Sequence, residues 1–431
     1  MEQAVEKIDK PFQIQLRMPG SKSITIRDLA LAALANGTST IRSPGFCDDT
    51  FRMADSLRKM GIPIDETPDD SLIVHGLNGH FPTEPVTLNV GQSATSTRSL
   101  MALCALRKGA THIDGHESMR VRPNKYLLDA LRHICADVES ANDGYLPATV
   151  TGIGQSADTI AMNGDKSSQY FSALMQIAPL FERGLRIDVK GELVSKPYID
   201  ITIHEMAKFG VIVENDNYRS FTVRPQTYHP VDLVVEGDAS AASYFSALAT
   251  VHGGKVTIDN LGNSTKQGDY GFFDICERLG ARVIRTAATT TIIGPKAGKL
   301  NAMSEPLDME MMPDVAVTLF AIAPFIPGTT RITGLSTLRI KECDRIEVPV
   351  TEMRKLGIEV TAGPDWVEIP FWSAPEADSA KQVSIRTYDD HRIAMSMAVL
   401  GSKTGGMVIT GAQCVEKTYP RFWQDLKKLY V

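Results

Sequence analysis

The sequence predicts an α/β protein made of six repeated units that form two domains of similar size. Two observations support this prediction. Helix candidates rich in small residues recur 71 to 77 residues apart along the 431-residue chain, and each is followed by a β-prone stretch and a second helix candidate. This period is longer than that of the familiar solenoid repeats. Given ordinary domain sizes, two globular domains of three units each fit better than a rod.

The first helix candidate of each unit is rich in Ala, Ser and Leu, which is typical of a helix buried inside a domain. These candidates are "SKSITIRDLALAALANG", "ATSTRSLMALCALRKG", "SSQYFSALMQIAPLFERG", "DASAASYFSALATVHGG", "MMPDVAVTLFAIAPFIPG" and "YDDHRIAMSMAVLGSKTG". Each ends near a Gly, which we expect to be the residue that stops the helix. The β-prone stretches that follow are "TSTI", "ATHI", "LRI", "KVTI", "TTRI" and "GMVI".

The second helix candidate of each unit is more amphipathic, with apolar residues at three- and four-residue spacing. The candidates are "DDTFRMADSLRKMGI", "NKYLLDALRHICADV", "YIDITIHEMAKFGVIV", "GDYGFFDICERLGARV", "DRIEVPVTEMRKLGIEV" and "YPRFWQDLKKLYV". All but the last are followed by β-prone sequence. We expect Asp48 and Asp49 to cap the first of these helices.

Composition narrows the function classes. The net charge of −6 argues against broad nucleic-acid binding, and no apolar run reaches membrane-spanning length. The N-terminal stretch "MEQAVEKIDK" resembles neither a signal peptide nor a transit peptide. The six cysteines are scattered, without a CxxC pair or zinc-type spacing. We therefore expect reduced thiols in a cytoplasmic protein, and no metal site.

The first helices begin with polar residues, and some of these carry the wrong charge for their position. Lys22 opens the first helix and Arg392 stands at the start of the sixth, although a helix N-terminus has a positive partial charge. A lysine there either points away from the helix end or has an anion between itself and that end. Aspartates, which suit the position and could be simple caps, stand at three starts: Asp238, Asp314 and Asp390. Six such ends converging on one cleft would form a strong anion site.

Eight motifs, in order, carry a resemblance to a known family. They are "PGSKSITIR", "SSQYFSAL", "SKPYIDIT", "EGDASAASYF", "PDVAVTL", "RIKECDRI", "YDDHRIAMSMAVL" and "EKTYPRFW". Together they resemble 5-enolpyruvylshikimate-3-phosphate (EPSP) synthase, an enolpyruvyl transferase family. The resemblance implies two domains, each of three βαβαββ units in an inside-out α/β barrel, with the active site in the interdomain cleft. The domains would be residues 21–236, and residues 1–20 together with 237–431.

The resemblance also implies the reaction. Family members transfer the enolpyruvyl group of phosphoenolpyruvate to the 5-hydroxyl of shikimate 3-phosphate and release phosphate, a step of the shikimate pathway of aromatic amino-acid biosynthesis. No cofactor and no metal are needed. The implied partners are these two small molecules, without nucleic acid or membrane, and the implied oligomeric state is a monomer. Two anionic substrates would explain cations at helix starts, and Lys22→Met would then abolish turnover with little loss of stability.

Individual roles follow from the same resemblance. The residues expected to bind shikimate 3-phosphate are Lys22, Ser23, Arg27, Ser167, Ser168, Ser195, Tyr198, Asp314, Thr337 and Lys341. Those expected to bind phosphoenolpyruvate are Lys22, Gln92, Ala94, Arg122, Gln169, Arg345, Arg392 and Lys417. Asp314 would be the general base toward the 5-hydroxyl and Glu342 the proton donor to the methylene carbon, and Lys22 would share the proton transfer.

Simpler readings exist for several of these residues. Ser167 and Ser168 could be ordinary helix caps. The stretch "KECDR", residues 341–345, could be a solvated charge cluster. His391 is expected to be structural or hydrogen-bonding rather than a nucleophile, and Cys343 to be a packing thiol.

The chain departs from the family pattern at a few positions. The loop that usually reads "GNAGTAxRxL" is "GQSATSTRSL" here, with Gln92 for Asn, Ala94 for Gly and Ser99 where many members have Pro. A methyl group at Ala94 would crowd a site where backbone approaches ligand, so we expect weakened binding of glyphosate, the family's inhibitor. Ile26 and Thr337 replace commoner Asn residues, which leaves open a paralogue with another acceptor alcohol.

Three other functions compete with this one. The UDP-N-acetylglucosamine enolpyruvyl transferase shares the fold, but its mobile loop carries a reactive Cys that "HESMRVRPNK" lacks. RNA 3′-phosphate cyclase uses related units, but its nucleotidylation histidine motif is not apparent and this chain is acidic. A non-catalytic binding protein would be expected to lose Asp314, Glu342 or Lys22, and all three are present.

Overall fold

The computed structural model describes residues 1–373 and 382–430. The chain divides into two compact units. We call Gly20–Val235 the N-unit, and Met1–Pro19 together with Glu236–Val431 the C-unit. Each unit has its own cluster of buried apolar side chains, which is the property expected of a separately folded domain.

The N-unit contains three four-stranded sheets. In spatial order the first consists of β14 (Asp232–Val234), β3 (Asn36–Arg42), β5 (Leu72–Leu77) and β4 (Ile64–Glu66). The second consists of β6 (Val86–Asn89), β7 (Thr111–Asp114), β9 (Tyr145–Gly152) and β8 (Ala136–Ala141). The third consists of β10 (Thr159–Asn163), β11 (Leu185–Lys190), β13 (Ser220–Val223) and β12 (Glu214–Asn215).

The three sheets share one pairing plan. In each sheet, the first two strands in the spatial order given above pair in parallel, and the remaining neighbours pair antiparallel. A parallel pair needs a crossover connection, and a helix supplies it between β6 and β7 and between β10 and β11. In the first sheet the parallel partner of β3 is β14, which comes from the far end of the unit.

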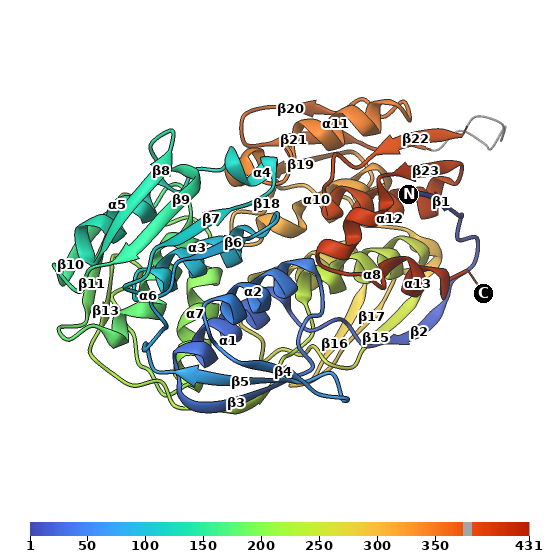
Figure 1. Cartoon of the computed structure of the whole chain (residues 1–431). Coiled ribbons are helices and arrows are strands. Elements are labelled where there is room, and N and C mark those ends of the chain that lie inside the picture. The colour runs from blue at the N-terminus through green and yellow to red at the C-terminus, as the bar shows by residue number, and fades with distance from the viewer. Residues whose placement is uncertain (374–381, 431) are drawn as a thin grey trace. The chain divides into compact units, whose positions relative to one another are not determined.

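The helices of the N-unit are of two kinds. The buried first helices are α1 (Lys22–Leu34), α3 (Ala94–Cys104) and α6 (Ser168–Ile177), which continues as the 3₁₀ turn η1 (Ala178–Leu180). The second helices are α2 (Asp48–Lys59), α5 (Lys125–Ile134) and α7 (Pro197–Lys208), with the short α4 (Glu117–Arg120) before α5. The three first helices contact one another, with the sheets of the unit around them (Figure 1). This confirms that the Ala- and Ser-rich helices are interior ones.

The C-unit repeats the plan. In spatial order its first sheet consists of β2 (Gln13–Leu16), β15 (Lys255–Ile258), β17 (Thr290–Ile293) and β16 (Arg282–Arg285). The second consists of β18 (Leu307–Asp308), β19 (Thr329–Thr333), β21 (Val367–Pro370) and β20 (Thr361–Ala362). The third consists of β22 (Val383–Arg386), β23 (Met407–Thr410) and β1 (Glu2–Val5). Again the first two strands of each pair in parallel. The N-terminal strands β1 and β2 thus complete two sheets whose other strands lie more than 230 residues later.

The helices of the C-unit follow the same division. The first helices are α8 (Ala239–His252), α10 (Ala316–Ile322) between the 3₁₀ turns η4 (Pro313–Val315) and η5 (Ala323–Phe325), and α12 (His391–Thr404). The others are η2 (Gly268–Gly271), α9 (Phe272–Arg278), η3 (Lys296–Gly298), η6 (Ser336–Ile340), α11 (Glu347–Arg354), η7 (Ala412–Lys417) and α13 (Phe422–Lys427). Here too the three first helices contact one another. The predicted α/β architecture of six units is confirmed.

Glycine stops fewer helices than the sequence predicts. α8 ends at Gly253 with φ +69°, and Gly405, with φ +70°, follows α12. By contrast, α1 is followed by Ala35 in an extended conformation, and the chain passes directly into β3. α3 is followed by helical Ala105, and 3₁₀ turns prolong α6 and α10. The prediction is therefore wrong for four of the six helices, because an extended residue or a tightened last turn can also end a helix.

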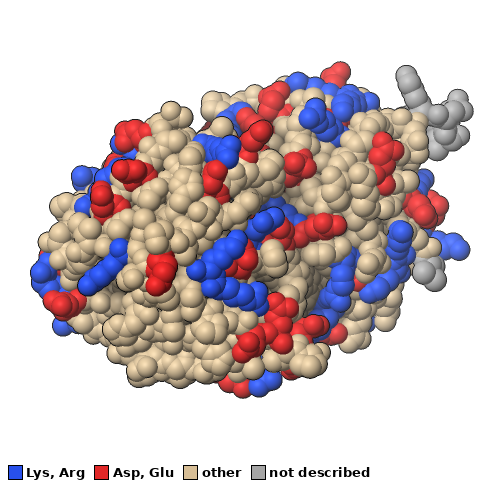
Figure 2. Space-filling view, viewed as in Figure 1, with Lys and Arg blue, Asp and Glu red and all other residues tan. Residues whose placement is uncertain are grey.

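On the face drawn in Figure 2, Lys and Arg side chains are interspersed with Asp and Glu. Among the described residues, none of the helices has the length and apolar character that crossing a membrane requires.

Candidate active site

Lys22 faces a carboxylate of the protein itself. Its Nζ lies 3.1 Å from Oδ2 of Asp49, whose side chain is only 1% exposed. Asp49 is the second residue of α2, where the helix N-terminus favours an anion. The sequence offered two explanations for Lys22, a harmless outward direction or a bound anion, and the ion pair with Asp49 is a third. Sequence reasoning missed Asp49 because a carboxylate at a helix start is usually explained as a cap.

The prediction that Asp48 and Asp49 cap α2 is wrong. The capping position belongs to Cys47, whose N–H donates to Oγ1 of Thr50 at 3.1 Å. Both aspartates lie in the first turn, and only Asp49 turns toward Lys22.

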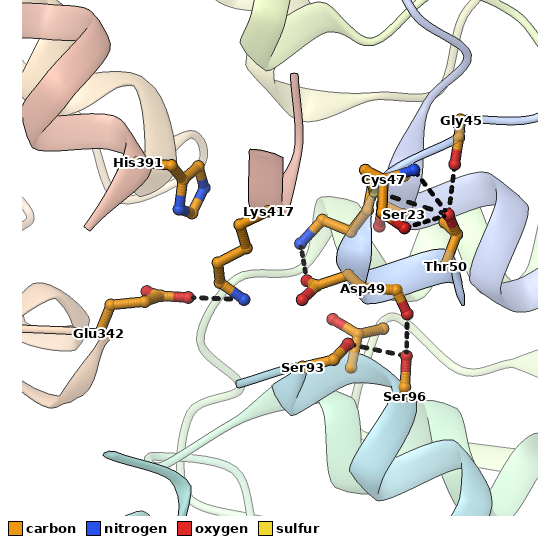
Figure 3. A network of polar contacts seen from close by, with 12 residues as sticks. Ser23, Gly45, Cys47, Asp49, Thr50, Ser93, Ser96, Glu342, His391 and Lys417 are labelled. Atoms are coloured by element: carbon orange, nitrogen blue, oxygen red, sulfur yellow. Dashed lines mark hydrogen bonds and ion pairs between the residues drawn. The ribbon is translucent and has the colours of Figure 1, made fainter. Parts of the chain in front are cut away.

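A chain of hydroxyl groups connects α2 with the start of α3 (Figure 3). Ser93 Oγ donates to Ser96 Oγ at 2.7 Å, and Ser96 Oγ donates to the Asp49 carbonyl oxygen at 3.1 Å. Both serines are fully buried. They lie in the loop expected to bind phosphoenolpyruvate, so this loop is tied to the helix that carries the partner of Lys22.

Arg27 is held by α1 and α7 together. Its Nε donates to Thr202 Oγ1 at 2.7 Å, and one terminal nitrogen donates to the Ser23 carbonyl and hydroxyl oxygens at 2.8 and 2.7 Å. The other terminal nitrogen donates to the Tyr198 carbonyl oxygen at 3.2 Å. Burial lowers the pKa of Arg27 to about 10, so it remains charged at neutral pH. The structure thus brings together Ser23, Arg27 and Tyr198 as predicted, and adds Thr202.

The starts of α3 and α6 are also connected. An Arg98 terminal nitrogen donates to Gln169 Oε1, and Gln169 Nε2 donates to Thr95 Oγ1 at 3.3 Å. The Ser167 hydroxyl accepts from the Gln169 N–H at 3.3 Å, so Ser167 caps α6. Ala94 is the first residue of α3.

The remaining predicted residues of the N-unit lie at loop ends and helix starts. Gln92 Nε2 lies 3.3 Å from His116 Nδ1. Arg122 is buried, and Ser168 is the buried first residue of α6. Ser195 precedes α7 with a left-handed backbone (φ +55°), which a non-glycine residue adopts only when its surroundings hold it.

Arg345 is the centre of a buried charge cluster in the C-unit. Its Nε and one terminal nitrogen donate to the two carboxylate oxygens of Asp390 at 2.7 and 3.1 Å. It also donates to Glu342 at 2.6 Å and to Asp314 at 3.2 Å. Burial alone would lower the pKa of Arg345, but the carboxylates of Asp390, Glu342 and Asp314 raise it above its ordinary value. The stretch "KECDR" is therefore not a solvated charge cluster.

Asp314 lies within reach of three cations and does not cap its helix. Its Oδ1 is 3.2 Å from Lys341 Nζ and from an Arg345 terminal nitrogen, and its Oδ2 is 3.1 Å from an Arg392 terminal nitrogen. Burial lowers the pKa of Lys341, an effect that the Asp314 charge opposes. Asp238 and Asp390, by contrast, do accept backbone N–H groups as helix caps. Asp390 is thus both a cap and the main partner of Arg345.

Glu342 bridges two cations, and His391 lies beside it (Figure 3). Lys417 Nζ is 3.4 Å from Glu342 Oε1, while Arg345 binds Oε2. His391 is buried, and neither ring nitrogen has a hydrogen-bond partner among the described residues. Burial lowers the pKa of His391 well below its ordinary value, so the ring is neutral. The burial of His391 agrees with the structural alternative of the expectation, which was a structural or hydrogen-bonding residue.

One more acid and a thiol lie beside this cluster. Asp269 and Arg392 both bind Ser240 Oγ, and burial together with the Asp314 charge raises the pKa of Asp269 to about 6. The Cys343 thiol lies 3.4 Å from Asp390 Oδ2, so it is more than a packing group. The sequence carried no signal for Ser240 or Asp269, because their roles depend on contacts between α8, η2 and α12. The hydroxyl of Thr337, in η6, is buried without a hydrogen-bond partner among the residues described.

The structure therefore presents two groups of polar residues, one in each unit. Among the predicted site residues, Arg27, Arg122, Ser168, Arg345, Arg392 and Lys417 are buried, whereas others such as Lys22, Gln92 and Ser195 are only partly buried. Among the residues described, no group of three or more His, Cys, Asp or Glu side chains has an arrangement that could hold a metal ion.

Comparison with known proteins places this arrangement in a family. The model of the family described as EPSP synthase (3-phosphoshikimate 1-carboxyvinyltransferase) matches residues 7–426. The chain belongs to this family. Relatives named 3-phosphoshikimate 1-carboxyvinyltransferase include one from Tolumonas auensis, 40% identical over 413 residues (95% of this chain and 94% of the relative). Another, from Ralstonia pickettii, is 38% identical over 419 residues (95% of each chain).

Solved structures show the same fold. An EPSP synthase from Acinetobacter baumannii superposes with a TM-score of 0.80 at 24% identity, covering 99% of this chain and 97% of that one. An enolpyruvyl transferase from Streptomyces tendae superposes with a TM-score of 0.76 at 16% identity, covering 99% of this chain and 96% of that one.

Proposed function

We propose that the protein transfers the enolpyruvyl group of phosphoenolpyruvate to the 5-hydroxyl of shikimate 3-phosphate and releases phosphate. The observation that carries the proposal is the charge cluster in which the buried Arg345 contacts Asp314 and Glu342, in a chain whose full-length relatives bear the name of this activity. Buried cations suit two anionic substrates, and adjacent carboxylates suit proton transfer.

The anionic groups of the substrates suit particular residues. Arg345 and Arg392 would bind the carboxylate of phosphoenolpyruvate, since a guanidinium matches a carboxylate with two parallel hydrogen bonds. The residues proposed around its phosphate are Lys22, Gln92, Ala94, Arg122, Gln169 and Lys417. Those proposed for shikimate 3-phosphate are Lys22, Ser23, Arg27, Ser167, Ser168, Ser195, Tyr198, Asp314, Thr337 and Lys341. Carboxylates such as Asp49 and Asp314 lie beside several of these cations.

The reaction needs one proton to arrive and one to leave. Asp314 would accept the proton of the 5-hydroxyl as its oxygen bonds to C2 of phosphoenolpyruvate, and Glu342 would protonate the methylene carbon. The C2–O bond to phosphate then breaks, the departing phosphate takes up the proton held by Asp314, and the new methyl group returns a proton to the Glu342 carboxylate, which gives the enol ether. Lys22 would share the proton transfer. Arg345 and Lys417 both contact Glu342 and favour its carboxylate, so protonation of Glu342 would follow the movement of Lys417 toward substrate phosphate.

We also propose reduced sensitivity to glyphosate, from the methyl group of Ala94 at the start of α3. A cytoplasmic monomer is part of the proposal, and the six cysteines, all free thiols, suit a reducing compartment.

The test is phosphate release by the purified protein. Release that requires both phosphoenolpyruvate and shikimate 3-phosphate, with weak inhibition by glyphosate, is the expected result. A folded protein that releases no phosphate with this pair would refute the proposed acceptor, and a screen of other alcohols would then look for the acceptor of a paralogous transferase.

A further inference from the structure

A short hydrogen-bonded chain inside the C-unit ends on Arg392. Ser240, the second residue of α8, donates its hydroxyl proton to Oδ2 of Asp269 in η2. The oxygen of the same hydroxyl accepts a hydrogen bond from a terminal nitrogen of Arg392 at 3.3 Å. Asp269 and Arg392 are both buried. Neither Ser240 nor Asp269 belongs to the residues proposed to bind a substrate.

The direction of this chain follows from the number of protons. A serine hydroxyl has one proton, and the Asp269 carboxylate accepts it. The hydroxyl oxygen is then an acceptor toward Arg392, whose guanidinium has only donors. Asp269 therefore fixes the orientation of the Ser240 hydroxyl, and that hydroxyl fixes one nitrogen of Arg392.

Helix capping does not account for Ser240 or Asp269. The cap of α8 is Asp238, which accepts the Ala241 N–H at 2.9 Å. Burial, and then the charge of Asp314, raise the pKa of Asp269 to about 6, so that ionising this carboxyl at neutral pH costs stability. Perturbed carboxyl groups of this kind cluster at functional sites.

Arg392 needs a support that does not depend on Asp314. Asp314 Oδ2 lies 3.1 Å from the same terminal nitrogen of Arg392, while its Oδ1 serves two other cations. As the general base, Asp314 loses its negative charge when it accepts the proton of the 5-hydroxyl, and its attraction for Arg392 weakens at that moment. The contact with Ser240 persists, because the reaction does not consume the charge of Asp269.

We propose that Ser240 and Asp269 are positioning residues, which orient the Arg392 guanidinium toward the carboxylate of phosphoenolpyruvate. The inference rests on the proposed function, in which Arg392 binds that carboxylate. The hydroxyl between Arg392 and Asp269 keeps the guanidinium available to the substrate, since a further carboxylate in direct contact would compete with that of phosphoenolpyruvate. Loss of the chain then weakens the use of phosphoenolpyruvate selectively.

The test is steady-state kinetics of phosphate release by the full-length protein, with each substrate varied at saturation of the other. Ser240→Ala removes the hydroxyl, Ser240→Thr retains it, and Asp269→Asn removes the charge behind it. The matched control is Ser246→Ala on the same helix, whose buried hydroxyl donates to the Ala242 carbonyl oxygen at 2.8 Å.

We expect Ser240→Ala to raise KM for phosphoenolpyruvate by about tenfold or more, because Arg392 loses a hydrogen bond to its charged group. KM for shikimate 3-phosphate should stay within about twofold of the wild type, since Arg392 is not among its proposed ligands. Ser240→Thr should restore KM for phosphoenolpyruvate to within about threefold of the wild type, and Ser246→Ala should match the wild type. An unchanged KM for phosphoenolpyruvate in Ser240→Ala, or equal rises of both KM values, would overturn the inference alone.

The double variant Ser240→Ala/Asp269→Asn separates positioning from a merely structural role. Because Asp269 acts through Ser240, the KM of the double variant for phosphoenolpyruvate should lie within about twofold of that of Ser240→Ala. Effects of the two substitutions that multiply would overturn the inference. Should Ser240→Ala not fold, Asp269→Asn makes the same comparison, with a selective rise in KM for phosphoenolpyruvate expected and unchanged KM values overturning the inference. A folded wild type that releases no phosphate with the two substrates would overturn the proposed function and this inference together.

Discussion

Replacing Asp49 by Asn should weaken both the fold and the reaction through Lys22. The substitution keeps the shape of the side chain but removes the negative charge 3.1 Å from the Lys22 ammonium. At that distance, two charges in an effective dielectric of about 20 attract by about 5 kcal/mol before desolvation is counted. Loss of one partner of a buried pair commonly costs 3–5 kcal/mol, and Lys22 is 18% exposed, so we expect a loss of about 2–3 kcal/mol.

The neighbouring Asp48→Asn is a matched control. Asp48 occupies the same first turn of α2, so both variants lose a similar favourable interaction with the helix end, about 0.3–1 kcal/mol. Asp48, however, is 39% exposed and pairs with Arg52 at 3.2 Å, a surface contact between residues four apart that contributes about 0.3–0.5 kcal/mol. The difference between the two variants in free energy of unfolding should therefore be roughly 2 kcal/mol.

Urea denaturation would measure that difference in the free energy of unfolding. Steady-state kinetics would measure the effect of each substitution on the reaction. We expect Asp49→Asn to lower kcat/KM for phosphoenolpyruvate by about 10- to 100-fold, because Lys22 loses the group that orients it, and Asp48→Asn to stay within about twofold of the wild type. Equal stability of the two variants, or unchanged kcat/KM in Asp49→Asn, would refute the reasoning.

Three further outcomes are expected. Ala94→Gly should lower the inhibition constant of glyphosate, measured in competition with phosphoenolpyruvate, by about tenfold or more, because one methyl group in a tight pocket usually has an effect of this size. An unchanged inhibition constant would contradict the role of Ala94. Asp314→Asn should lower kcat by about 10²–10⁴ as the general base is lost, and a wild-type kcat excludes Asp314 from that role. The stability that protonated Asp269 contributes is present below about pH 4 and is lost as pH rises through its pKa of about 6. The free energy of unfolding of Asp269→Asn, measured by urea denaturation and compared with that of the wild type, should therefore rise by about 3 kcal/mol between pH 4 and pH 8. A difference between the two proteins that does not change with pH would exclude this titration.

The sequence was informative about the fold because its signals are local and repeated. The Ala- and Ser-rich stretches predict interior helices, and α1, α8 and α12 are buried almost along their whole length. The resemblance implied that residues 1–20 belong with the C-terminal domain, but it did not predict which strand completes each sheet. β14 joins the sheet of β3, and β1 and β2 join sheets of the C-unit. Short extended segments do not reveal their partners, since pairing depends on where distant parts of the chain meet.

The candidate site divides in the same way. Lys22, Arg345 and Glu342 could be singled out from motifs, and their roles in the reaction stay predictions. Their partners could not, because Asp49 and Asp390 look like ordinary helix-start residues in sequence. The ion pair with Asp49 also changes the expectation for Lys22→Met, which should now lose stability rather than retain it.

The sequence by itself determined the sixfold α/β repeat, the family and the set of polar residues at the helix starts, because periodicity and motif are written within short stretches of chain. The tertiary structure decided which of these residues form ion pairs and which are desolvated. Those properties depend on distances of a few ångströms and on the exclusion of water, and both arise only when helices far apart in the chain pack against one another.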